Sequence, residues 1–189
     1  MKMTKKVIIS GLFGGLTLVI WMFLVNGLLR FNSSMNMKQI PNENEVYEIL
    51  KEHITEPGRY TCNPALTPER RFPEGEPVFS ILYGGVGHEA AGRNMLVGLV
   101  VFFLSSIVAC WLLSLTSERI LSSYPRKVLF FFLIGLLFAL FNDLTNFGIG
   151  DYPFSDALIL AIHDIIVWTV VGLVVAWRMR PETSTETSL

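Results

Sequence analysis

The fold is decided by residues 128–177, which read VLFFFLIGLLFALFNDLTNFGIGDYPFSDALILAIHDIIVWTVVGLVVAW. Two apolar runs flank a short turn, and about 20 apolar residues are enough to cross a bilayer as a helix. Polar side chains interrupt both runs, although polar groups are costly in contact with lipid. The stretch predicts transmembrane helices at 128–148 and 157–177, an outer turn at 149–156 and a buried polar cluster.

The composition indicates an integral membrane protein. Of the 189 residues, 51% are hydrophobic and 16% are charged, whereas soluble domains carry about 25% charged residues. Two further apolar runs predict an N-terminus with a first transmembrane helix at 1–30 and a second helix at 95–115. The net charge of −1 and the lack of a dense basic cluster give no reason to expect nucleic acid as a partner. The expected surroundings are the lipid bilayer.

A polar stretch at 31–94 separates the first two apolar runs. Apolar residues recur at helical spacing over about 42–55, which predicts an amphipathic helix. Residues near 59–62 and 77–83 are rich in β-branched and aromatic side chains, which favours two short strands. The expected fold class is therefore mainly α: a four-helix transmembrane bundle with a small α+β extracytoplasmic insertion between helices 1 and 2.

The positive-inside rule gives an orientation. It predicts a cytoplasmic loop at 116–127, a cytoplasmic tail at 178–189 and both termini in the cytoplasm, in what we expect to be a bacterial inner membrane. The short turn on the other side holds Asp151 and Asp156 and no basic residue. The basic residues that fall on the expected cytoplasmic side are Lys2, Lys5, Lys6, Arg119, Arg126, Lys127, Arg178 and Arg180.

Small residues in the first helix predict close helix packing. Gly11 and Gly15 form a G-x-x-x-G pattern, which lets a second helix approach the backbone. We expect the second helix to belong to the same bundle, with a homo-oligomer or another membrane protein as the alternative partner. Asn26, near the end of this helix, is expected to form a hydrogen bond across helices.

The polar residues of the last two helices form the candidate site. Because the two helices are antiparallel about the turn, Asn142 is expected at the depth of His163, and Asp143 within about one helical turn of it. Residues three and four positions apart share a helix face. The expected intramembrane cluster comprises Asn142, Asp143, Asn146, His163 and Asp164.

Several roles remain open for this cluster. The structural role is favoured, because an Asp–His pair with amides fixes helix register and avoids an isolated buried charge. A proton relay, a metal site built from two carboxylates and an imidazole, and a pocket for a polar or cationic small molecule are the functional alternatives. Whether a metal is bound is left open, and no cofactor is expected.

No catalytic motif stands out elsewhere. The sequence has no nucleotide-binding loop, no arrangement around a serine or cysteine nucleophile and no H-E-x-x-H motif, so we do not expect an enzyme. Cys62 and Cys110 lie in a polar and an apolar segment, and we expect no disulfide between them. The expected function is a non-enzymatic structural, assembly or interaction role. The alternative is a small transporter, channel or sensor that uses Asp143, His163 and Asp164.

The chain resembles a group of small bacterial four-span membrane proteins with no assigned function. The resemblance rests on the Gly-rich first helix with Trp21, on Ile40-Pro41-Asn42-Glu43, on Glu56-Pro57-Gly58-Arg59-Tyr60 and on Ala176-Trp177-Arg178. It covers most of the chain and implies no activity, ligand or catalytic residue. The expected topology is also similar to that of claudin-like proteins, but the paired loop cysteines of that family are missing.

Overall fold

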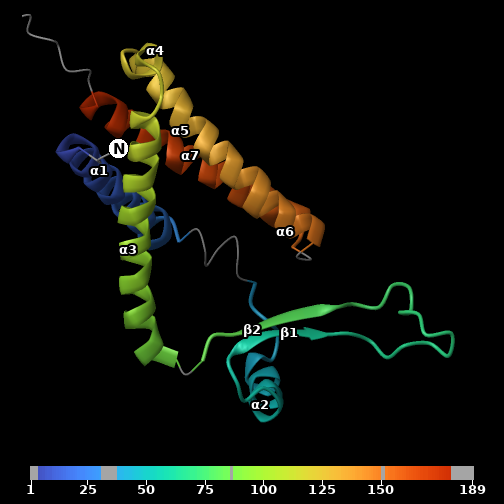
Figure 1. Ribbon diagram of the computed structural model, residues 1–189. Helices are drawn as coiled ribbons and strands as arrows, with labels where there is room; N and C mark the ends of the chain where they lie inside the picture. Colours follow the sequence, from blue (N-terminus) through green and yellow to red (C-terminus); the bar gives the residue numbers. More distant parts are fainter. Residues whose placement is uncertain (1–3, 31–37, 86, 150–151, 180–189) are drawn as a thin grey trace, which may run out of the picture. The chain divides into compact units, whose positions relative to one another are not determined.

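The structure, a computed structural model, describes residues 4–30, 38–85, 87–149 and 152–179. The chain divides into two compact units (Figure 1). One unit, here called the bundle, comprises the apolar helices on both sides of residues 38–95. The other, here called the polar unit, is Lys38–Met95.

Long helices dominate the described part of the chain. Four of them are long and apolar enough to cross a membrane: Lys5–Leu28, Asn94–Ser114, Tyr124–Gly148 and Phe154–Arg178. This confirms the expectation of a mainly helical protein with four long apolar helices. The elements are α1 (Lys5–Met22), η1 (Phe23–Leu28), α3 (Gly87–Ser114), α4 (Glu118–Leu121), α5 (Tyr124–Phe138), η3 (Ala139–Asp143), α6 (Leu144–Ile149) and α7 (Phe154–Arg178).

The bundle leaves most of its apolar surface open. Between 22% and 33% of the residues in the most apolar window of each long helix are buried inside the protein. The outward side chains are large and apolar, for example Phe141 and Leu137. Exposed apolar patches of this extent are rare on soluble monomers, so the four helices indicate a multi-pass membrane protein.

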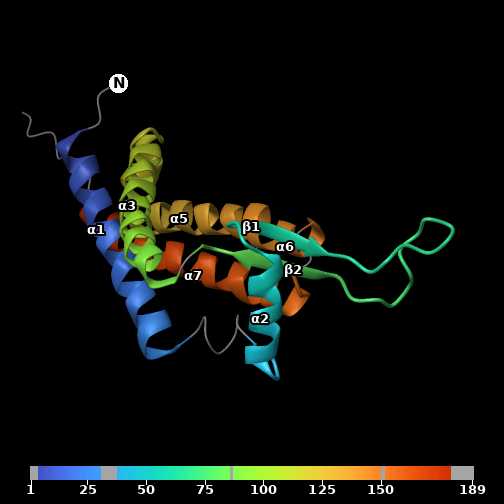
Figure 2. The same ribbon diagram turned by 90° about the horizontal axis from the view of Figure 1, so that it is seen from below.

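Helices α5 and α7 run side by side in both views (Figures 1 and 2). Glycines permit the close approach: a Cβ on Gly135 would lie 2.9 Å from the carbonyl oxygen of Asp164, and one on Gly172 would lie 2.6 Å from Cβ of Phe131. The fully buried Phe131 and Val171 form the core at this contact. The tight contact fixes the level at which polar groups on the two helices meet.

Helix α1 packs closely on α3. A Cβ on Gly11 would lie 2.6 Å from the Cα of Ile107, and one on Gly15 would lie 2.9 Å from the Cα of Phe103. The G-x-x-x-G pair therefore serves packing within the bundle.

Helix α5 begins at Tyr124, earlier than the expected 128. Pro125 stands in its first turn, where a missing backbone N–H costs nothing. Lys127 is consequently inside the helix and buried, and its Nζ donates a hydrogen bond of 2.6 Å to the carbonyl of Met179. A cation at the end of α7 satisfies a carbonyl that has no partner within the helix, which explains why a charge expected in the loop is buried.

The polar unit contains helix α2 (Glu43–His53) and strands β1 (Gly58–Cys62) and β2 (Phe79–Tyr83). The strands pair antiparallel, from Gly58 opposite Tyr83 to Cys62 opposite Phe79, which confirms the expected small two-stranded sheet. The hydroxyl of Tyr60 donates a 2.6 Å hydrogen bond to the carbonyl of Glu56. Cys62 is exposed and Cys110 is buried; both are free thiols.

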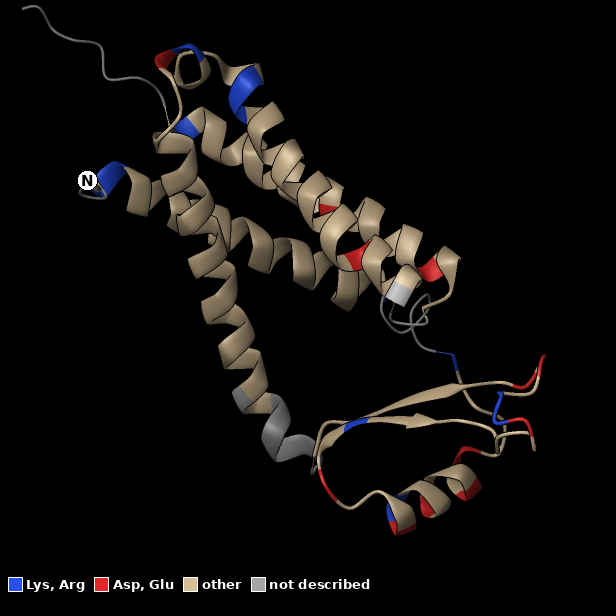
Figure 3. Ribbon diagram, turned by 45° about the vertical axis from the view of Figure 1, so that its right-hand side comes forward, with Lys and Arg blue, Asp and Glu red and all other residues tan. Residues whose placement is uncertain are grey.

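Most basic residues of the bundle gather at one end (Figure 3), although Arg30 follows η1 at the other end of the first apolar helix. Lys and Arg gather at the end where α1 and α5 begin and α7 ends, together with Glu118 of α4. The aspartates of η3 and α7 lie away from that end. Of the residues counted for the expected orientation, Lys2, Asp151 and Arg180 lie outside the described residues.

Candidate functional site

A cavity of about 460 Å³ lies within the bundle and is lined by residues of α1, η1, α3, α5, η3, α6 and α7. Its volume falls in the range of about 300–1,000 Å³ that is typical of small-molecule pockets. The structure places all of the polar residues singled out in the sequence on its lining: Asn142, Asp143, Asn146, His163 and Asp164.

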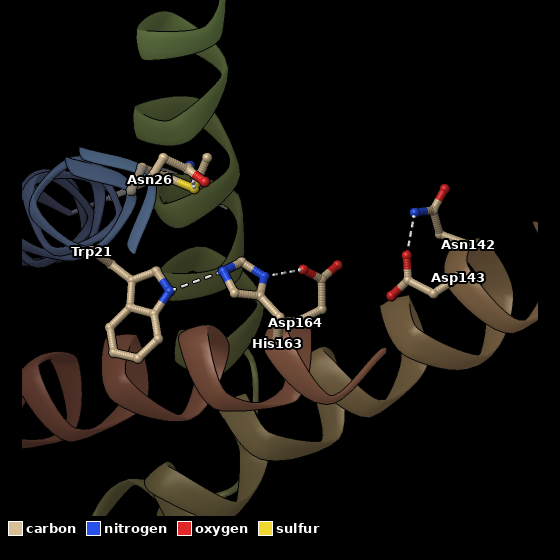
Figure 4. Close-up of polar contacts among 7 residues, drawn as sticks. Trp21, Asn26, Asn142, Asp143, His163 and Asp164 are labelled. Carbon is tan, nitrogen blue, oxygen red and sulfur yellow. Dashed lines mark hydrogen bonds and ion pairs between the residues drawn. The ribbon is translucent and has the colours of Figure 1, made fainter. Parts of the chain in front are cut away.

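Three side chains form a hydrogen-bonded chain beside the cavity (Figure 4). Trp21 of α1 donates from Nε1 to Nε2 of His163, at 3.1 Å. The other ring nitrogen, Nδ1, lies 3.2 Å from Oδ1 of Asp164. The chain joins α1 to α7 and gives both ring nitrogens of His163 a partner.

The Trp21 contact determines the tautomer of His163. An indole N–H is a donor only, so Nε2 must accept and cannot carry a proton. The imidazole proton is therefore assigned to Nδ1, and this N–H donates a hydrogen bond to Oδ1 of Asp164. In this arrangement His163 is a neutral imidazole held between a donor and a carboxylate.

Asp143 lies apart from this chain, on the facing helix (Figure 4). Its Oδ1 accepts a 2.8 Å hydrogen bond from Nδ2 of Asn142. Its Oδ2 is buried and has no hydrogen-bond partner among the residues that the structure describes, and the whole residue is 3% exposed. A buried acceptor without a partner costs about 1–3 kcal/mol, and more when it is charged.

Two π-helical segments carry polar residues of the site. Asn26 lies in η1, and Asn142 and Asp143 lie in η3. A π turn holds one more residue than an α turn and is frequent at functional sites. Asn26 donates to Sδ of Met22 at 3.7 Å, and its Oδ1 is buried without a partner in the described part of the chain.

Aromatic and aliphatic side chains complete the cavity. Trp168 stacks on Phe138 with ring centroids 5.7 Å apart and planes 12° apart, and on Phe131 at 6.4 Å and 18°. Phe102 of α3 and Leu18 of α1 also line the space. The lining thus combines a few polar groups with a mainly apolar wall, as in many small-molecule pockets.

Sequence reasoning missed two members of the site. Trp21 gave a usable signal, because a buried indole N–H needs an acceptor and His163 is the one histidine in an apolar run. Asn26 was expected to bond across helices, but its amide nitrogen bonds to Met22, one turn earlier in the chain. Asn26 itself lines the cavity, and its Oδ1 has no partner among the described residues. The π turn that orients Asn26 has no recognisable pattern in the sequence.

The site has no metal-like arrangement in the described ranges: no three His, Cys, Asp or Glu side chains come together in a way that holds a metal ion. Comparisons with protein-family models, curated proteins and solved structures found no match to the chain. The chemistry of the cavity itself therefore carries the functional argument.

Proposed function

We propose that this chain is a multi-pass protein of the bacterial inner membrane that binds a small molecule in the cavity of its bundle, as a sensor or transporter. In the proposed orientation both termini are cytoplasmic and the polar unit is extracytoplasmic. The gathering of Lys and Arg at one end of the bundle supports this orientation.

One observation carries the binding function. Asp143 presents a buried oxygen without a hydrogen-bond partner, among the described residues, at a cavity large enough for a small molecule. Side chains that serve only to hold helices together satisfy one another, because unpaired polar groups are costly in a membrane. The Trp21–His163–Asp164 chain meets that description and Asp143 does not.

The structural, assembly or interaction role favoured by the sequence stays a prediction for the rest of the molecule. The Trp21–His163–Asp164 chain supports a structural contribution, since it ties α1 to α7. The cavity combines carboxylates, amides, hydroxyls and an imidazole with a mainly apolar wall, a lining that suits the binding of a small molecule.

Filling the cavity tests the function without knowledge of the ligand. Ser105 lines the cavity from α3, whereas the neighbouring Leu104 is 56% exposed and lies outside it. We expect Ser105→Phe to abolish a small-molecule adduct that co-purifies from the host membrane, because the new ring occupies the ligand's space. Native mass spectrometry of the wild type, Ser105→Phe and the control Leu104→Phe measures the adduct.

The control separates a filled cavity from a general disturbance of α3. Leu104→Phe should retain the adduct at the wild-type level. An adduct that persists equally in both variants, or its absence from the wild type, would contradict the proposed binding function.

A further inference from the structure

The hydrogen bonds around the cavity leave acceptors in excess. Three donors in and beside the lining are in use: Trp21 bonds to His163, His163 to Asp164, and Asn142 to Asp143. The buried lining atoms without a partner, in the ranges that the structure describes, are both acceptors: Oδ2 of Asp143 and Oδ1 of Asn26. A group that satisfies them must donate N–H or O–H bonds.

The charge of the cavity lining favours a positively charged ligand. Asp143 and Asp164 both face the cavity, and no lysine or arginine is among the described residues that line it. His163 is neutral while it accepts from Trp21. Asn146 and Tyr152 add an amide and a hydroxyl that can donate or accept. A bound cation would therefore meet two carboxylates without a competing positive side chain.

The size and the walls of the cavity exclude a bare ion as a good fit. About 460 Å³ is space for a molecule, and most of the surrounding surface is apolar or aromatic. Trp168 and Phe138, which stack on one another, line the cavity and give it an aromatic wall that suits an apolar or aromatic group. Ring faces also attract cations.

We propose that the ligand is a small organic amine bound as its ammonium ion, with N–H donors on Asp143 and an apolar body against Trp168 and Phe138. This inference rests on the proposed binding function and names its ligand class. The ammonium group supplies the donors that Oδ2 of Asp143 lacks, and Oδ1 of Asn26 accepts from any second donor along the molecule. Hydrogen bonds between ionised groups are stronger than those between neutral groups.

Three probes of similar shape test the inference on the full-length protein in lipid nanodiscs. They are 2-phenylethylamine, its N,N,N-trimethyl derivative, which is a cation without N–H donors, and 3-phenylpropionate, which is an anion. Isothermal titration calorimetry measures the affinities. We expect the amine to bind at least tenfold more tightly than the trimethyl derivative, and the anion not to bind.

Two matched substitutions assign the effect to the carboxylate. Asp143→Asn should weaken amine binding at least tenfold. Asp156→Asn makes the same chemical change on an aspartate that lies outside the cavity and bonds to Ser155, and it should leave the affinity unchanged. Size-exclusion profiles that match the wild type verify that both variants fold.

The outcomes distinguish the ligand class from the function. Equal binding of the amine and its trimethyl derivative, binding of the anion, failure of the amine to bind, or amine binding unaffected by Asp143→Asn would each overturn the amine assignment. The binding function is judged separately, by whether Ser105→Phe removes the co-purifying adduct.

Discussion

A single N–H group on Trp21 determines how the polar side chains of the bundle share their hydrogen bonds. Its hydrogen bond to Nε2 places the proton of His163 on Nδ1, and the Nδ1–H group donates a hydrogen bond to Asp164. Asp164 thereby has a donor within the protein, whereas one oxygen of Asp143 has none among the described residues. The two aspartates that line the cavity thus differ in their hydrogen-bond partners: Asp164 pairs with His163, and Asp143 pairs with Asn142.

The Trp21 bond should contribute measurably to stability. We expect Trp21→Phe to lower the free energy of unfolding by about 1–2 kcal/mol, since a net hydrogen bond contributes ~1 kcal/mol and the smaller ring leaves a gap. Equilibrium unfolding in mixed micelles measures the change, with Trp111→Phe as the control because Trp111 is 38% exposed.

A double variant tests whether the loss comes from the bond itself. Trp21→Phe and His163→Leu remove the same interaction. The double variant should therefore lose less free energy of unfolding than the sum of the losses in the two single variants. Additive costs, or an equal loss from Trp111→Phe, would show that the Trp21–His163 contact is not the cause.

At the scale of elements, the cavity depends on helices that are held close elsewhere. Gly11 and Gly15 bring α1 onto α3, and Gly135 and Gly172 bring α5 onto α7. In membranes such contacts between small residues supply much of the packing, because lipid gives no hydrophobic drive for association. The two tight contacts leave the polar cavity in the remaining space between the helices.

Adding one methyl group at the α1–α3 contact should be costly. The Cβ of Gly11→Ala would lie 2.6 Å from the Cα of Ile107, a backbone atom, so the helices must separate. We expect a loss of about 1–3 kcal/mol in the free energy of unfolding. Gly98→Ala on α3 meets nothing within 4 Å and should be neutral or stabilising by up to ~1 kcal/mol. Similar losses in both variants would contradict the close packing.

At the scale of the whole molecule, we propose that the polar unit is extracytoplasmic and that both termini are cytoplasmic. The two native cysteines report on it, because Cys62 is exposed in the polar unit and Cys110 is buried in the bundle. We expect a membrane-impermeant maleimide to label intact spheroplasts, and Cys62→Ser to abolish the labelling. Labelling that requires permeabilised membranes would reverse the proposed orientation.

The sequence was sufficient for the helices and for part of the site, for physical reasons. Apolar runs long enough to span a bilayer define helices regardless of their neighbours. The antiparallel turn brings residues such as Asn142 and His163 to similar depth, and both line one cavity. The positions of Trp21 and Asn26 in the site were not predicted, because depth along α1 and η1 does not tell which way their side chains face. The burial of Lys127 was not predicted, because a charged residue assigned to a loop is expected to contact water.

The π turn of η3 also bears on how such proteins diverge. A π turn is an α-helix that has gained one residue, and each helical residue turns the chain by about 100°. A homologue that lacks one residue within 139–143 would keep an intact, equally apolar helix, but its aspartate would point away from the cavity. Chain length across this single turn, rather than the presence of an aspartate, should therefore mark which relatives retain the site.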